Sequence, residues 1–243
     1  FINTQVCEGC GDCVERSQCA AVMPVDTPFG RKRQIDQSAC NVDLSCLQGF
    51  CPSFVTVEGG ELRRAEPAGE APPVPLPVLP ALSEPCNVLI VGIGGTGVIT
   101  IGAILGMAAH LVGAGCSVLD NTGIARKGGA VTSDVRLAPK PDDIHVARIA
   151  DRTADFVLAC DLVTSATPAV LAKIEQGRTR VIANATAIPT LNQRLALDGT
   201  LDGDALQGAL IDSAGDGHCD VIDSMAIAAQ MLGDAIYANM VML

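Results

Sequence analysis

Seven cysteines in the first 52 residues constrain the fold of this chain more than any other feature. They read Cys7-x2-Cys10-x2-Cys13-x5-Cys19, and then Cys40-x5-Cys46-x4-Cys51-Pro52. Three thiolates, each separated by two residues, wrap one side of an iron–sulfur cubane in a tight loop, and a distant cysteine before proline completes the ligand set. The spacing therefore predicts a small iron–sulfur domain of the ferredoxin type and, with it, electron transfer.

One cluster has a clear set of candidate ligands. In two-cluster bacterial ferredoxins the fourth cysteine of each run binds the other cluster, so the remote cysteine before proline should close the first site. The predicted ligands are Cys7, Cys10, Cys13 and Cys51. The cysteines left over are Cys19, Cys40 and Cys46. These three could hold a second cluster with an open or non-protein position, a three-iron cluster or no cluster, and their spacing does not choose among these.

Zinc and disulfides are the alternatives to iron in a region so rich in cysteine. A zinc site commonly needs two cysteine pairs about 12–20 residues apart, whereas this chain has a triplet and no second Cys-x2-Cys. The later cysteines lie in apolar segments and are interpreted as buried thiols, which disfavours disulfides and indicates a reducing compartment, the cytoplasm. They are Cys86, Cys116, Cys160 and Cys219.

Proline usage divides the chain of 243 residues into two domains. Residues 66–85 contain seven of its 14 prolines, too many for the interior of a helix or a sheet. Such a segment should run as a semi-rigid connector. We therefore expect a ferredoxin-like [4Fe–4S] domain over residues 1–65, a linker over 66–85 and a second domain over 86–243.

The charge and hydropathy of the chain exclude two classes of partner. The net charge of −11 argues against nucleic-acid binding, because phosphate neutralisation requires a basic surface. The basic run at residues 31–33 is interpreted as a solvated hairpin tip, with a docking patch for an acidic electron carrier as the alternative. No stretch approaches the ~20 apolar residues of a membrane span. The chain begins without methionine and ends without a helix stop signal, so we expect a fragment of a longer polypeptide.

Residues 87–113 predict a buried strand, a glycine turn and a long apolar helix. Gly92, Gly94 and Gly97 match G-x-G-x-x-G, in which glycines allow a tight turn and close approach to a phosphate at the helix N-terminus. The next strand, 116–119, ends in Asp120, where a dinucleotide-binding fold places its ribose-binding acid. Glycine turns also serve purely structural corners, and the segment that follows decides against a dinucleotide.

That segment, DNTGIARKGGAVTSDVRL at 120–137, combines paired glycines with two cations and an alternating strand, which suits an exposed functional loop. The loop, the turn GIGGTGVITIGAIL at 92–105 and the strand DFVLACDLV at 155–163 resemble the gamma domain of 2-oxoacid:ferredoxin oxidoreductases. The cysteine-rich half, with CEGCGDC, PVDTPFGRKRQID and CNVDLSCLQGFCPSF, is similar as well. The match is closest to indolepyruvate ferredoxin oxidoreductase of the long fused type.

The resemblance implies an α/β fold, a Rossmann-like twisted gamma domain preceded by the iron–sulfur domain. It implies an internal part of an enzyme that oxidatively decarboxylates an indolepyruvate-like aryl 2-oxoacid to an acyl-CoA and passes the electrons through iron–sulfur clusters to ferredoxin. Thiamine diphosphate would be bound by domains absent from this chain, so we expect no catalytic residue here and no turnover by this part alone. The full-length enzyme is expected to be a cytoplasmic homo-oligomer.

The same resemblance suggests which residues meet the cofactor-bearing domains. The glycine turn and the loop would line that interface, with contact to a phosphate or to coenzyme A. The candidate residues are Gly92, Gly94, Gly95, Gly97 and Lys127. Arg126 stands where such loops usually carry glutamine, so no role is carried over to it.

The remainder of the chain predicts alternating elements: a strand at 155–160, a helix at 168–176, a strand at 179–184 and a helix from 224 onward. Asp161 and Asn184 follow two of these strands, where open α/β sheets build clefts, although turn formation explains both equally well. Two other functions compete with the main hypothesis. They are a flavin- or NAD(P)-binding reductase with an attached ferredoxin module, and a zinc-stabilised adaptor without redox chemistry.

Overall fold

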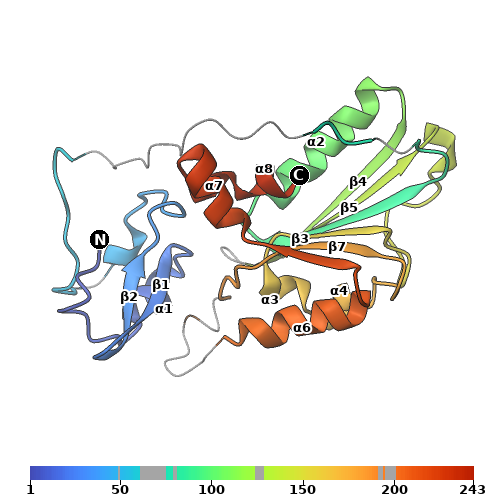
Figure 1. Ribbon diagram of the computed structural model, residues 1–243. Helices are drawn as coiled ribbons and strands as arrows, with labels where there is room; N and C mark the ends of the chain where they lie inside the picture. The colour runs from blue at the N-terminus through green and yellow to red at the C-terminus, as the bar shows by residue number, and fades with distance from the viewer. Residues whose placement is uncertain (49, 61–74, 79–80, 124–128, 191–193, 195–200) are drawn as a thin grey trace. The chain divides into compact units, whose positions relative to one another are not determined.

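The computed structural model in Figure 1 describes residues 1–48, 50–60, 75–78, 81–123, 129–190, 194 and 201–243. The chain forms two compact units. The first contains the described residues up to 60 and parts of two later segments, and the second contains the described remainder. Residues 66–74 and 79–80 of the predicted linker lie outside the described residues, so the division at this linker stays a prediction.

An antiparallel hairpin is the frame of the first unit. β1 (Val22–Thr27) pairs with β2 (Gly30–Ile35) around a tight turn. A short helix, α1 (Asp12–Ser17), and a 3-10 helix, η1 (Ser45–Leu47), carry two of the cysteine segments. The small core of the unit includes two of the cysteines themselves. Its buried cluster consists of Ile2, Cys7, Val14, Cys19, Ala21 and Val22.

The basic run at residues 31–33 corrects one expectation. It lies along β2 and not at the tip of the hairpin, which residues 28 and 29 form. A strand directs alternate side chains to opposite faces, so Arg31 and Arg33 share one face of β2 and Lys32 lies on the other. Arg33 is 1% exposed, whereas Arg31 and Lys32 are half-buried. The run is therefore not a uniformly solvated patch.

A six-stranded mixed sheet organises the second unit. Its order is β4-β5-β3-β6-β7-β8, with β3, β6, β7 and β8 parallel and β5 antiparallel to both β3 and β4. The strands are β3 (Cys86–Ile93), β4 (Gly115–Thr122), β5 (Ala130–Ala138), β6 (Phe156–Ala159), β7 (Arg180–Asn184) and β8 (Cys219–Ile222). The predicted α/β fold class is confirmed.

Helices cover both faces of this sheet, as Figure 1 shows: α2 and α8 lie over one face, and α3, α4 and α6 lie over the other. The helices are α2 (Val98–Leu111), α3 (Leu162–Ser165), α4 (Pro168–Leu171), α6 (Gly203–Ala214), α7 (Ser224–Leu232) and α8 (Ala238–Met242). Short 3-10 segments are η2 (Pro141–Asp143) and η3 (Ala235–Tyr237). None of the helices in the described residues has the length and apolar character needed to cross a membrane.

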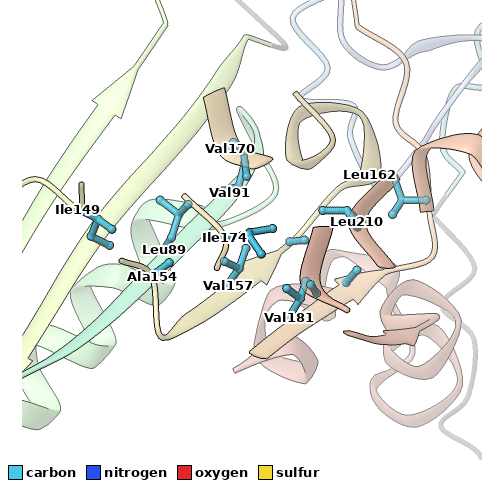
Figure 2. Packing of buried hydrophobic residues seen from close by; sticks show 13 residues of the cluster. Leu89, Val91, Ile149, Ala154, Val157, Leu162, Val170, Ile174, Val181 and Leu210 are labelled. Atoms are coloured by element: carbon cyan, nitrogen blue, oxygen red, sulfur yellow. The ribbon is translucent and has the colours of Figure 1, made fainter. Parts of the chain in front are cut away.

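Strand β3 is buried on both faces and supplies two separate cores. Leu89 and Val91 join the cluster seen in Figure 2, which packs against the α3, α4 and α6 side. Val88 and Ile90 point the other way and pack with Ile101 of α2. This division follows from the two-residue period of a strand, and it explains why β3 is an almost continuous apolar run.

Candidate functional site

A cavity in the first unit brings together all four predicted ligands of the first cluster. Cys7, Cys10, Cys13 and Cys51 line it, and Cys46 joins them. Cys10 and Cys51 are exposed, whereas Cys7 is buried and Cys13 half-buried. The sequence placed Cys46 with a second site, so its position in this cavity shows that the two sets of cysteines lie next to each other.

Glycines shape the loop around Cys10. Gly9 and Gly11 have φ angles of 77° and 86°, in the left-handed region that glycine occupies without a steric penalty. A Cβ at Gly9 would lie 2.2 Å from the carbonyl oxygen of Arg31, so no other residue fits there. The N–H of Gly9 donates to the sulfur of Cys7 at 3.4 Å. Such hydrogen bonds orient and tune thiolate ligands.

Arg33 is the least expected member of this cavity. Arg33 lines the cavity, and none of the three nitrogens of its buried guanidinium has a hydrogen-bond partner. Burial raises the pKa of the Cys13 thiol to about 11, and the positive charge of Arg33 opposes that rise. A buried charge without a partner is costly, so the arrangement calls for an anionic group in the cavity.

A cluster held by thiolates is anionic, which is the charge that the buried guanidinium of Arg33 calls for. Among the described residues, no three His, Cys, Asp or Glu side chains gather closely enough to hold a single metal ion. The thiolates of a cubane each bind a different iron, so a cluster needs a wider arrangement of ligands than one ion does. The four cysteines in the wall of the cavity could supply such separate ligands, and the buried guanidinium of Arg33 could balance the negative charge of the cluster.

The three remaining cysteines also lie near one another. Cys19 belongs to the buried core of the first unit, and Cys40 and Cys46 pack against that core. Burial raises the pKa of Cys46, and the neighbouring charges of Cys19 and Cys40 add to the rise. The N–H of Cys19 donates to Ser17 Oγ at 3.0 Å, and its carbonyl accepts from Nη1 of the buried Arg194 at 2.8 Å. The structure therefore brings the predicted second set together.

The glycine turn lies between β3 and α2 in the second unit. Gly92 lies close to Thr96 and Cys160. A Cβ atom at Gly92 would be 2.3 Å from Thr96 Oγ1 and 3.1 Å from the Cβ atom of Cys160. Gly94 and Gly95 lie in the turn, and Gly95 and Gly97 have φ angles of 105° and 81°. A Cβ at Gly97 would lie 2.3 Å from Nδ2 of Asn239. A side chain of α8 thus lies against the residue before α2.

The structure tests the expectation for Asp120, whereas the expectation for Lys127 lies outside the described residues. Asp120 lies within β4, and β4 is separated from β3 by β5 in the sheet. In a dinucleotide-binding fold the strand with the acid is a parallel neighbour of the strand before the glycine turn, so Asp120 is not placed in that manner. Lys127 and Arg126 lie outside the described residues.

Asp161 follows β6 as predicted, whereas Asn184 is the last residue of β7, and both side chains form hydrogen bonds with the backbone. The buried carboxylate of Asp161 caps α3, accepting from the N–H of Val163 at 2.9 Å and of Thr164 at 3.0 Å. Burial raises its pKa, and these hydrogen bonds oppose the rise. Asn184 Nδ2 donates to the carbonyl of Cys160 at 3.2 Å. Turn formation is the correct interpretation of Asp161.

Comparison with known proteins shows which family the second unit matches. The model of the family described as pyruvate ferredoxin/flavodoxin oxidoreductase matches residues 87–243, more than half of the chain. The chain belongs to this family. Within the pyruvate ferredoxin/flavodoxin oxidoreductase family it is similar to the indolepyruvate oxidoreductase subunit IorB of Methanothermobacter thermautotrophicus, with 28% identity over 157 residues. That alignment covers 65% of this chain and 75% of the relative. The predicted resemblance to 2-oxoacid:ferredoxin oxidoreductases is confirmed.

Three solved structures are similar to the chain at low identity. The PORC subunit of pyruvate oxidoreductase from Thermotoga maritima has 18% identity and a TM-score of 0.44, covering 66% of this chain and 73% of that one. The gamma subunit of a keto/oxoacid ferredoxin oxidoreductase from Geobacter sulfurreducens has 18% and 0.41, covering 65% and 72%. The 2-oxoglutarate:ferredoxin oxidoreductase of Magnetococcus marinus has 19% and 0.46, covering 65% and 23%.

Sequence reasoning missed Arg33 as a member of the site. The available signal was the position of the basic run between two groups of cysteines, read together with the alternation of a strand. The family match begins at residue 87 and leaves the cysteine-rich region untouched. The iron–sulfur site therefore stays a prediction for this member of the pyruvate ferredoxin/flavodoxin oxidoreductase family, and the support for it comes from the spacing and position of the cysteines of the first unit.

Proposed function

We propose that this chain is the electron-carrying part of an indolepyruvate, or similar aryl 2-oxoacid, ferredoxin oxidoreductase. The observation that carries the proposal is the cavity of the first unit, where four correctly spaced cysteines meet a buried guanidinium without a partner. The family match of the second unit supports the 2-oxoacid chemistry. The similarity to IorB, a subunit of an indolepyruvate oxidoreductase, supports an aryl substrate.

In this function the first unit holds a [4Fe–4S] cluster through Cys7, Cys10, Cys13 and Cys51. When bound, the cluster takes up and passes on one electron at a time. The chain contributes the surroundings that set the reduction potential of the cluster. The Gly9 N–H donates to the Cys7 sulfur, and Arg33 supplies positive charge in a region shielded from water. Both features favour the more negative, reduced form.

The remaining chemistry belongs to parts outside this chain. Thiamine diphosphate domains would decarboxylate the 2-oxoacid, coenzyme A would accept the acyl group, and ferredoxin would collect the electrons. We place the complete enzyme in the cytoplasm as a homo-oligomer. Gly92, Gly94, Gly95, Gly97 and Lys127 stay candidates for contact with those domains or with a phosphate of coenzyme A.

Metal and sulfide analysis tests this proposal directly. The chain is reconstituted without oxygen, and iron, zinc and acid-labile sulfide are counted together with a visible spectrum. About four iron and four sulfide per chain for one cubane, or about eight for two, with a brown absorbance that bleaches on reduction, support it. Zinc without sulfide overturns the electron-transfer function of the first unit, and tightly bound flavin supports the reductase alternative.

A further inference from the structure

Two loops of the first unit share one pattern of residues. The first reads Cys7-x2-Cys10-x2-Cys13, and the second reads Cys40-x2-Asp43-x2-Cys46. Aligning the outer cysteines places Asp43 at the position of Cys10. A cysteine follows each loop at a distance, Cys19 after the first and Cys51 after the second. The two loops therefore share one spacing, in which Asp43 stands where the first loop has a cysteine.

The backbone repeats in the same way. The residues on either side of Cys10 have φ angles of 77° and 86°, and those on either side of Asp43, Val42 and Leu44, have φ angles of 58° and 57°. In each loop the second of these residues is the left-handed cap that precedes a helix, α1 in the first and η1 in the second. The two loops thus turn in the same sense around their middle residue.

Left-handed conformations have different costs in the two loops. Glycine adopts them freely in the first loop, but Val42 and Leu44 carry a Cβ and each costs about 1–2 kcal/mol. Strain of this kind persists where the surrounding structure determines the backbone, commonly at ligand sites. The second loop has left-handed residues at the same two positions as the first, although valine and leucine disfavour that conformation.

The surroundings of Asp43 match the second set of cysteines. Cys40 and Cys46 pack against the core cluster that contains Cys19, and Asp43 lies midway between Cys40 and Cys46 in the same loop. Asp43 Oδ1 accepts from the N–H of Ser45 at 3.0 Å and from its hydroxyl at 2.7 Å. Ligating carboxylates are commonly oriented by hydrogen bonds of this type.

We propose that Asp43 is the fourth ligand of a second iron–sulfur cluster, whose other ligands are Cys19, Cys40 and Cys46. This inference rests on the proposed function, because it extends the same iron–sulfur chemistry to the second loop. It follows the rule that the remote cysteine of one run closes the cluster of the other run. Carboxylate oxygen is a harder ligand than thiolate and binds the iron of a sulfide cluster less firmly. The corner held by Asp43 is therefore the exchangeable one.

Iron loss from that corner is the measurable consequence. On oxidation by ferricyanide, the second cluster gives up one electron to the oxidant and releases one ferrous ion, which leaves a three-iron cluster with all irons ferric. The whole chain is reconstituted without oxygen, and iron is counted before and after oxidation while electron paramagnetic resonance detects the three-iron product. We expect about eight irons falling to about seven, with the three-iron signal appearing.

Four variants locate the effect. Asp43→Cys should keep about eight irons after oxidation and give no three-iron signal, and Asp43→Ala should hold about seven from the start. Cys19→Ser should abolish the signal, because it removes a ligand of the same cluster. Asp36→Ala is the matched control, since Asp36 Oδ1 also accepts from the N–H two residues on, that of Ser38, at 2.9 Å. It should behave as the unaltered chain does.

Three outcomes overturn the inference. Identical iron counts and spectra in the unaltered chain, Asp43→Cys and Asp43→Ala would show that Asp43 binds no iron. About four irons in every variant would show that the second cluster does not form, while the first cluster and the proposed function stand. Absence of iron and sulfide from the unaltered chain would remove the proposed function along with the inference.

Discussion

Replacing Arg33 by methionine should change the stability of the first unit in opposite directions with and without a cluster. The Arg33 side chain is 1% exposed and none of its guanidinium nitrogens has a partner. Apolar replacement of buried charged groups is often stabilising by about 1–4 kcal/mol, and methionine fills much of the space of the arginine stem. In the cluster-free chain we expect Arg33→Met to raise the free energy of unfolding by about 2 kcal/mol.

The cluster-loaded chain should respond in the opposite way. A hydrogen bond to a charged group contributes about 1.5–3 kcal/mol, and Arg33→Met would remove such bonds to the anionic cluster. Loss of a positive charge also favours the oxidised, less negative cluster. The reduction potential of the first cluster should therefore fall, by on the order of 60 mV if the one-electron equilibrium changes tenfold.

Native-state hydrogen exchange in increasing urea measures the stability of this unit by itself, because peptides from α1 and β1 report its opening separately from the second unit. Lys32→Met is the matched control: it removes the same charge from the neighbouring, half-exposed position of β2 and should change stability by less than about 0.5 kcal/mol. A loss of more than about 1 kcal/mol in cluster-free Arg33→Met would refute the reasoning, since it would show that the guanidinium is already satisfied.

Three further predictions concern the second unit. Gly97→Ala should lower the free energy of unfolding by about 1–3 kcal/mol, because φ at Gly97 is 81° and the new Cβ would meet Asn239; adding Asn239→Gly should restore only the steric part in thermal unfolding. Burial raises the pKa of Asp161, so the folded chain binds that proton more tightly than the unfolded chain does. The stabilisation from this carboxyl should be complete below the unfolded pKa of about 3.9 and decrease as the pH rises through the raised value; a flat difference between the unaltered chain and Asp161→Asn across that window would contradict this. Burial raises the pKa of Cys160 to about 12, so at about pH 8 iodoacetamide should label Cys10 of the cluster-free chain and leave Cys160 unmodified, as read by mass spectrometry.

Local signals in the sequence were sufficient for the centre of the second unit. The apolar run of β3, the glycine turn and the start of α2 at Val98 all follow from periodicity and from glycine chemistry. Helix ends were harder to predict. The helix expected at 168–176 is α4, which ends at Leu171, and α7 ends at Leu232 because Gly233 adopts a left-handed conformation with φ of 81°. Short helices depend on tertiary packing more than on propensity.

Spacing was enough to select the four candidate cysteines of the first site, which the structure brings to one cavity, because cluster chemistry requires a triplet and a remote cysteine whatever the rest of the fold. That they bind a cluster stays a prediction. The burial of Arg33 and the contact made by Asn239 could not be predicted from the sequence. The burial of Arg33 depends on the register of the hairpin, and the contact between Asn239 and Gly97 joins segments far apart in the chain. Neither position carries a motif. Residues that act through their neighbours are found only when the neighbours are placed.

The core of the first unit contains two of the proposed ligands, Cys7 and Cys19, among its six buried cluster residues in the described part of the chain. If the proposed clusters are bound, cluster assembly and the folding of this unit depend on the same side chains. Without a cluster, the core would keep two free thiols, and the guanidinium of Arg33 would stay without a hydrogen-bond partner. Loss of a cluster should therefore loosen this core and make the unit more susceptible to proteolysis.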